Sequence, residues 1–217
     1  DVLGALGYNP AVVCSPSGRA ALSGGFLPES KKLAQKALKK LQNSAKTLKN
    51  APILGVEASA VLSAVDEYGR LLPEEKKWIE DQRIATIDKF LADELPKLTG
   101  TKQLFAPYPE EILLHVHCHQ KSLESAGDTA YVLQLLLGTK VNRVKSSCCG
   151  MAGSYGMKTE NFEMSKKMAD LVLLPAIEAF EGEHIVATGT SCRHQIQDLS
   201  TRSALHLMDV LWEQLLF

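Results

Sequence analysis

The sequence lacks the long apolar runs that cross a bilayer, since stretches such as residues 131–137 are far too short. Its first residues do not resemble a signal peptide, so we do not expect one. An excess of charge is also missing, because 24 basic residues balance 25 acidic ones. We therefore expect neither a transmembrane segment nor binding to nucleic acid. A G-x-G-x-x-G fingerprint after a strand is absent as well, so this segment alone is not expected to bind a dinucleotide or be catalytic.

The cysteines are five in number, an odd count that includes one adjacent pair: Cys14, Cys118, Cys148, Cys149 and Cys192. Such a set does not resemble a secreted disulfide framework. Neighbouring thiols also cannot easily bond each other without straining the backbone. In a chain without an export signal, cysteines grouped near histidines favour metal binding or redox chemistry, and a reducing, cytoplasmic location.

Predicted strands alternate with predicted helices along the 217 residues. Short apolar runs predict strands at 11–13, 52–56, 112–116, 141–144 and 184–187. Helical spacing of apolar residues predicts helices at 28–48, 58–68, 73–81, 84–95, 128–137, 159–180 and 204–216. This alternation predicts an α/β fold with mainly parallel sheets. A content of 45% hydrophobic and 23% charged residues is that of a globular protein.

An internal repeat divides the chain into two similar α/β halves. Gly18 aligns with Gly150 and Ala60 with Cys192, and 42 residues separate the two positions in each copy. Residues 1–98 are the first repeat, residues 110–217 the second, and the proline-rich residues 99–109 are the linker.

The two copies differ where chemistry is expected. Pro16 and Ser17 stand in place of Cys148 and Cys149, so the first repeat lacks cysteine ligands. The first repeat also begins inside a helix whose counterpart ends near Gly138, so we expect it to be truncated at its N-terminus. A truncated sheet leaves an open strand edge, which favours pairing with another chain, and a homodimer would provide such a pairing.

Four cysteines carry the predicted site: Cys118, Cys148, Cys149 and Cys192. The strands of a parallel sheet all end at the same edge. Cys118, Cys148 and Cys192 each lie shortly after a predicted strand, and Cys149 is adjacent to Cys148. Thiolates are soft ligands that suit iron–sulfur clusters and zinc. Gly150 follows the pair and allows its backbone N–H to approach a sulfur. The simpler alternative, a buried cysteine that only packs, is preferred for Cys14.

Histidines flank two of the cysteines. Strand alternation turns His115 and His117 away from the Cys118 thiol. His119 lies beyond the strand end, and His194 follows Cys192 by two residues, so these two are the candidates for an additional ligand or a residue supporting the ligands.

Three segments together resemble the cysteine-rich CCG domain: His117-Cys118-His119-Gln120, Cys148-Cys149-Gly150-Met151-Ala152-Gly153 and Thr190-Ser191-Cys192-Arg193-His194-Gln195. That family occurs in a subunit of heterodisulfide reductase and in the iron–sulfur subunits of glycolate oxidase and anaerobic glycerol-3-phosphate dehydrogenase. The turn Ser17-Gly18-Arg19-Ala20 makes the C-terminal region of FAD-linked oxidases look closest.

The resemblance implies an iron–sulfur cluster of the [4Fe–4S] type on Cys118, Cys148, Cys149 and Cys192. It also implies a parent enzyme that oxidises a 2-hydroxy acid such as lactate or glycolate. FAD would be held by a flavin domain upstream in that parent chain, and electrons would pass through this region to an acceptor that the sequence does not identify.

The sequence leaves two alternatives open. The family motif ends in Cys-x-x-Cys, but Gln195 stands at its last position here. A structural zinc module for subunit or domain assembly is therefore the first alternative. A metal-free thiol redox protein that uses Cys148 and Cys149 is the second.

Overall fold

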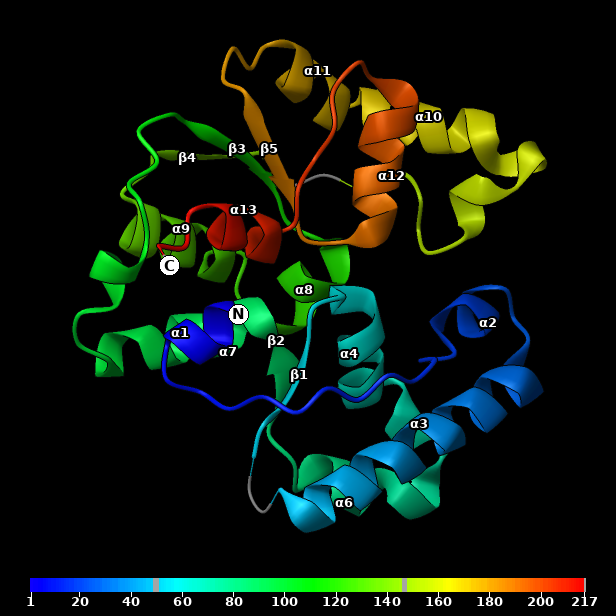
Figure 1. Ribbon diagram of the computed structural model, residues 1–217. Helices are drawn as coiled ribbons and strands as arrows, with labels where there is room; N and C mark the ends of the chain where they lie inside the picture. Colours follow the sequence, from blue (N-terminus) through cyan, green and yellow to red (C-terminus); the bar gives the residue numbers. More distant parts are fainter. Residues whose placement is uncertain (49–50, 146–147, 217) are drawn as a thin grey trace.

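A three-stranded parallel sheet organises the second half of the chain (Figure 1). The computed structural model describes residues 1–48, 51–145 and 148–216. Strand β3 (Ile112–His115) lies between β4 (Val141–Arg143) and β5 (His184–Ala187) and pairs in parallel with both. All four residues of β3 are buried, as expected of the central strand of a sheet covered on both faces.

Helices cover both faces of this sheet. On one face, α9 (Asp128–Leu137) and α13 (Leu207–Glu213) pack on Ile112 and Leu114. On the other face, α10 (Phe162–Asp170), α11 (Leu173–Glu178) and α12 (Thr190–Leu199) pack on Leu113. The alternation of side chains along β3 thus supplies two separate apolar cores. The short helix α8 (Cys118–Leu123) follows β3 directly.

The first half contains a smaller parallel sheet, in which β1 (Ile53–Gly55) pairs with β2 (Ile84–Thr86). The parallel pairing in both sheets confirms the predicted α/β class. The helices of this half are α1 (Val2–Ala5), α2 (Arg19–Ser23), α3 (Leu27–Thr47), α4 (Ala58–Asp66), α5 (Tyr68–Leu71), α6 (Lys76–Glu80) and α7 (Ile87–Glu94). No helix in the described part of the chain has both the length and the apolar content that a membrane crossing needs.

The glycines aligned by the internal repeat have similar local structure. Gly18 and Gly150 both adopt positive φ, +74° and +94°. Each faces the backbone oxygen of a buried serine in a later helix, Ser30 of α3 for Gly18 and Ser165 of α10 for Gly150. Both turns therefore need glycine for the same physical reason.

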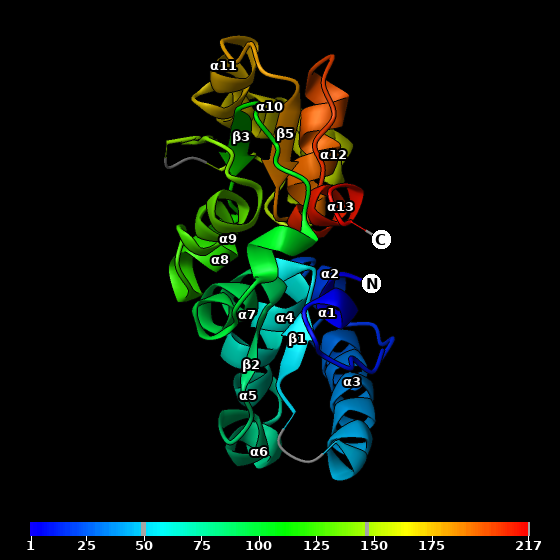
Figure 2. The ribbon, with the colours of Figure 1, turned by 60° about the vertical axis from the view of Figure 1, so that its left-hand side comes forward.

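One apolar core spans the boundary between the halves. Helix α7 packs against α9, and Phe90 and Leu133 belong to the same buried cluster (Figure 2). The proposed linker also contributes, since Phe105 and Tyr108 are buried in this cluster. The boundary at 99–109 stays a prediction that rests on the internal repeat. In the structure, the packing across this boundary joins the two halves.

Three predicted elements differ from the structure. Residues 11–13 form no strand, and Val12 is 87% exposed. Residues 84–86, expected to be helical, form β2, because pairing with β1 outweighs local helix preference. The helix expected over 159–180 is broken between α10 and α11. Pro175 explains the break, because it has no N–H to continue the helical bonds and lies in the first turn of α11.

Ser146 and Ser147, which directly precede the cysteine pair of the predicted site, lie outside the described residues.

A buried carboxyl group lies where the halves meet. Asp88, the second residue of α7, is 1% exposed, and its Oδ2 accepts a hydrogen bond of 3.3 Å from Gln120. Burial, together with the nearby negative charge of Glu124, raises the pKa of Asp88 to about 7. Within the described part of the chain, its Oδ1 has no hydrogen-bond partner.

This carboxyl predicts a pH-dependent stability. The pKa of Asp88 in the folded state exceeds the usual value of 3.8, so the unfolding free energy falls as pH rises from about 4 to about 7. We expect Asp88→Asn to be more stable than wild type at pH 8, by roughly 2 kcal/mol, and not at pH 4. Urea unfolding at both pH values measures this. Asp81→Asn is the exposed control, and equal pH slopes for Asp88→Asn and wild type would contradict the prediction.

Candidate metal centre

The four predicted cysteines follow the three strands of the larger sheet. Cys118 is the first residue of α8 and lies three residues after the last residue of β3. Cys148 and Cys149 lie in the turn after β4, and Cys192 is in the first turn of α12, after β5. Because the strands are parallel, their carboxyl ends meet at one edge, and the cysteines meet there too.

Hydrogen bonds link the four thiols in a row. Cys118 contacts Cys148, Cys148 contacts Cys149, and Cys149 contacts Cys192. The row leads from the surface into the core, since Cys118 is exposed whereas Cys149 and Cys192 are 4% and 1% exposed. All five cysteines, Cys14 included, are free thiols, and Cys14 is exposed rather than buried as packing would require. The structure therefore brings together the predicted set.

The direction of the pKa shift alternates from one cysteine to the next along the row. The hydrogen bond from Cys118 lowers the pKa of Cys148, and the same bond raises the pKa of Cys118. Hydrogen bonds to Cys148 and Cys192 raise the pKa of Cys149. The hydrogen bond between Cys149 and Cys192 lowers the pKa of Cys192. The thiolate is the form that binds metal, so a metal bound here would displace the thiol protons.

His115 joins the thiols, although strand alternation pointed to His119 as the nearest imidazole. A ring nitrogen of His115 lies within 4.8 Å of the sulfurs of Cys149 and Cys192. The ring is 2% exposed and hydrogen-bonded to Cys192. The strand ends at His115, so alternation says nothing about Cys118, which belongs to a helix. His115 shares the face of β3 on which Leu113, Cys149 and Cys192 form one cluster.

The other histidines have different surroundings. His117 caps α8, because its Nδ1 accepts a hydrogen bond of 3.2 Å from the backbone N–H of His119. The ring of His119 lies beside Asp66 and Glu67, and burial lowers its pKa. His194 is exposed on α12, about half a turn from the buried Cys192. The structure does not bring the rings of His119 and His194 to the thiols.

Gly150 supports the cysteine turn in two ways. Its N–H donates to the sulfur of Cys148 at 3.3 Å. A Cβ at this position would lie 2.0 Å from the backbone oxygen of Ser165. Gln195, at the last position of the family motif, is 2% exposed and donates to Ser165 Oγ at 2.9 Å. The turn is therefore packed against α10, which Gln195 ties to α12.

Glu57, a carboxylate of the first half, caps α12, the helix that carries Cys192. The sequence did not predict this contact. Glu57 accepts bonds of 3.3 Å from Ser59 N at the start of α4 and 2.8 Å from Thr190 N at the start of α12. Although burial opposes it, the hydrogen bonds from Thr190 lower the pKa of Glu57. Helix N-termini attract negative charge, so one carboxylate stabilises two helices and joins the halves. The only sequence signal is that Glu57 precedes a predicted helix.

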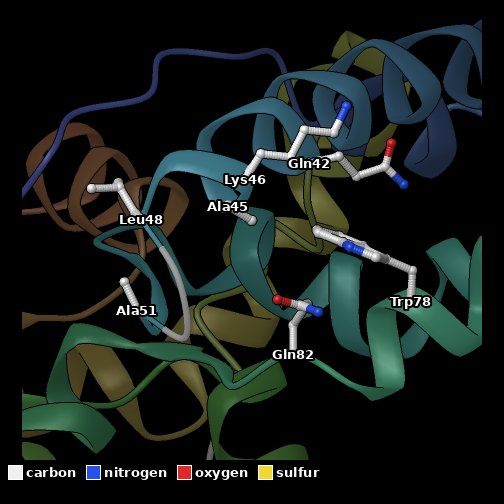
Figure 3. A pocket seen from close by; sticks show the side chains of 7 residues that line it. All are labelled: Gln42, Ala45, Lys46, Leu48, Ala51, Trp78 and Gln82. Atoms are coloured by element: carbon white, nitrogen blue, oxygen red, sulfur yellow. The ribbon is translucent and has the colours of Figure 1, made fainter.

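A surface hollow lies elsewhere, between α3 and α6 (Figure 3). Its volume is about 500 Å³, and its lining residues are Gln42, Ala45, Lys46, Leu48, Ala51, Trp78 and Gln82. These residues include no cysteine, histidine or carboxylate. The hollow therefore offers none of the metal-ligating side chains that meet at the sheet edge.

A family model and several known proteins match the segment that contains the cysteine motifs. Residues 112–197 match the family model of the CCG cysteine-rich domain. The chain is 28% identical to D-2-hydroxyglutarate dehydrogenase of Pantoea ananatis and 29% identical to that of Escherichia coli, over 96% of its length. It is 26% identical to a subunit of the anaerobic glycerol-3-phosphate dehydrogenase of Escherichia coli, over 89% of its length. The chain spans 20% of each of these D-2-hydroxyglutarate dehydrogenases and 48% of that subunit. No solved structure matches the chain significantly.

Two alanine substitutions separate backbone strain from the packing of the cysteine turn. Gly138 also has positive φ, +68°, but a Cβ there would meet nothing within 4 Å. We expect Gly138→Ala to cost about 1 kcal/mol of unfolding free energy. Gly150→Ala should cost about 3 kcal/mol or more, because strain and a backbone clash combine. Denaturant titration of both variants measures the difference, and equal losses would show that Gly150 is needed only for its φ.

Proposed function

Because residues 112–197 form a cysteine-rich domain of the CCG family, we propose that the chain is an electron-transfer region of a larger oxidoreductase. In this proposal Cys118, Cys148, Cys149 and Cys192 hold an iron–sulfur cluster of the [4Fe–4S] type. The observation that carries it is the continuous row of four sulfurs at one sheet edge.

The donor set fits such a cluster. Four thiol sulfurs are the usual ligands of iron–sulfur centres, and hydrogen bonds to sulfur adjust the reduction potential. Here Gly150 N–H donates to the sulfur of Cys148. The burial of Cys149 and Cys192 shields one side of the site from water. Cys118 leaves the other side at the surface, where electrons can be exchanged with a partner domain.

The parent enzyme follows from the relatives by analogy. Their names describe dehydrogenases of hydroxyl-bearing substrates, D-2-hydroxyglutarate and glycerol-3-phosphate. We extend this to a 2-hydroxy acid as the substrate of the parent of this chain, with lactate and glycolate as the expectation from the sequence. Oxidation would occur on FAD in another domain of that parent, from which this region receives electrons. Free thiols are consistent with a reducing, cytoplasmic compartment.

Anaerobic reconstitution with iron and sulfide tests the cluster. We expect wild type to bind iron and acid-labile sulfide in comparable amounts. Cys149→Ser and Cys192→Ser should each lower bound iron about tenfold or more, because each removes a buried ligand. Cys14→Ser is the matched control and should bind iron as wild type does, since Cys14 is outside the row of thiols.

The same measurement separates the two alternatives. Zinc bound without sulfide, at the same four cysteines, would replace the cluster by a structural zinc site. No bound metal, together with reversible oxidation of the thiols, would instead favour a thiol redox function. Either result would overturn the proposed cluster.

A further inference from the structure

A second group of ligand atoms lies outside the thiol centre. Asp66, Glu67 and His119 each place one carboxylate oxygen or ring nitrogen within 4.8 Å of the others. The two acids come from the first half and the histidine from α8 in the second half. Helices α4 and α8 pack against each other, so the group lies at the boundary between the halves.

The acids lie where α4 ends and α5 begins. Asp66 is the last residue of α4, and Glu67 is both the C-cap of α4 and the N-cap of α5. The C-terminus of α4 carries partial negative charge, so it repels the carboxylate of Asp66 and attracts cations. Arg70 donates to Asp66 Oδ1 at 2.8 Å, and Arg19 forms an ion pair with Glu67 Oε1. Each arginine therefore holds one oxygen of its carboxylate and leaves the other oxygen available.

Two of the available atoms are shielded from solvent. Glu67 Oε2 and His119 Nδ1 are both buried atoms and have no hydrogen-bond partner among the described residues. Leaving such polar atoms unpaired inside the protein is energetically unfavourable. The atoms of the group lie close together yet share no hydrogen bond that would satisfy them. The three ligand atoms lie within 4.8 Å of one another, which is near the separation of about 3–4 Å that metal–ligand bonds of about 2.1 Å require.

We propose that Asp66, Glu67 and His119 bind one divalent transition-metal ion, separate from the thiol centre. Two carboxylates and one imidazole suit ions such as Mn²⁺, which thiolates do not favour. The arginines would orient the carboxylates, as groups behind metal ligands commonly do. Because His119 directly follows Cys118, the ion would also fix the first turn of α8 relative to α4. This site does not depend on the proposed cluster.

Manganese binding to the reconstituted protein tests the site. Free aqueous Mn²⁺ gives an electron paramagnetic resonance signal that decreases when the ion binds to protein. We expect wild type to bind one Mn²⁺ per chain. Glu67→Gln and His119→Gln should weaken binding about tenfold or more, because each removes one ligand. The matched controls are the exposed residues Glu160 and His194, and Glu160→Gln and His194→Gln should bind Mn²⁺ as wild type does.

Further variants separate this site from the cluster and from misfolding. Cys192→Ser should lose iron but keep Mn²⁺ binding. Asp66→Asn retains an oxygen for Arg70 and should fold as wild type does by circular dichroism while binding Mn²⁺ more weakly. Absence of Mn²⁺ binding to wild type would overturn the proposal and assign the unpaired atoms to a bridging water. Unchanged binding by Glu67→Gln and His119→Gln would overturn it as well.

Discussion

The parallel pairing of β3 with both neighbours is the constraint on which the rest of the structure depends. Parallel strands need crossover connections, so β4 and β5 each return to the sheet after a helical segment. All three strands consequently end at the same edge, and the segments that leave them there carry the cysteines. The sulfurs meet although 74 residues separate Cys118 from Cys192. The fold supplies the geometry, and four of the five cysteines lie at these positions.

The two halves stabilise similar turns by different means. In the first half, Tyr68 donates a hydrogen bond of 2.5 Å to the backbone oxygen of Ser17, and Arg19 pairs with Glu67. In the second half, thiols occupy the turn, and Cys148 accepts from Gly150. Protein hydrogen bonds and an ion pair thus hold the first turn, whereas the second presents sulfurs that a metal can bind. Both turns need glycine for its positive φ, and they differ in whether thiols are present.

The sequence predicted the parts of the site that depend on regular elements. Strand 184–187 and helix 128–137 have the predicted bounds, and the cysteines lie where those bounds place them. The histidines could not be assigned in the same way. Whether His115 or His119 approaches the sulfurs depends on the residue at which β3 ends, and element ends are poorly marked in a sequence. Strand β2 was missed for a related reason, because only its distant partner β1 stabilises residues 84–86 as a strand.

Contacts between the halves are the least predictable from sequence and the most important for the site. Glu57 caps α12 across 133 residues, and Gln120 of α8 bonds Asp88 of α7. Both contacts hold elements that carry cysteines, α12 with Cys192 and α8 with Cys118. Polar contacts at such distances follow from packing, which local patterns do not encode. The first half, which lacks thiols at the matched positions, therefore still contacts and supports the two helices that carry Cys118 and Cys192.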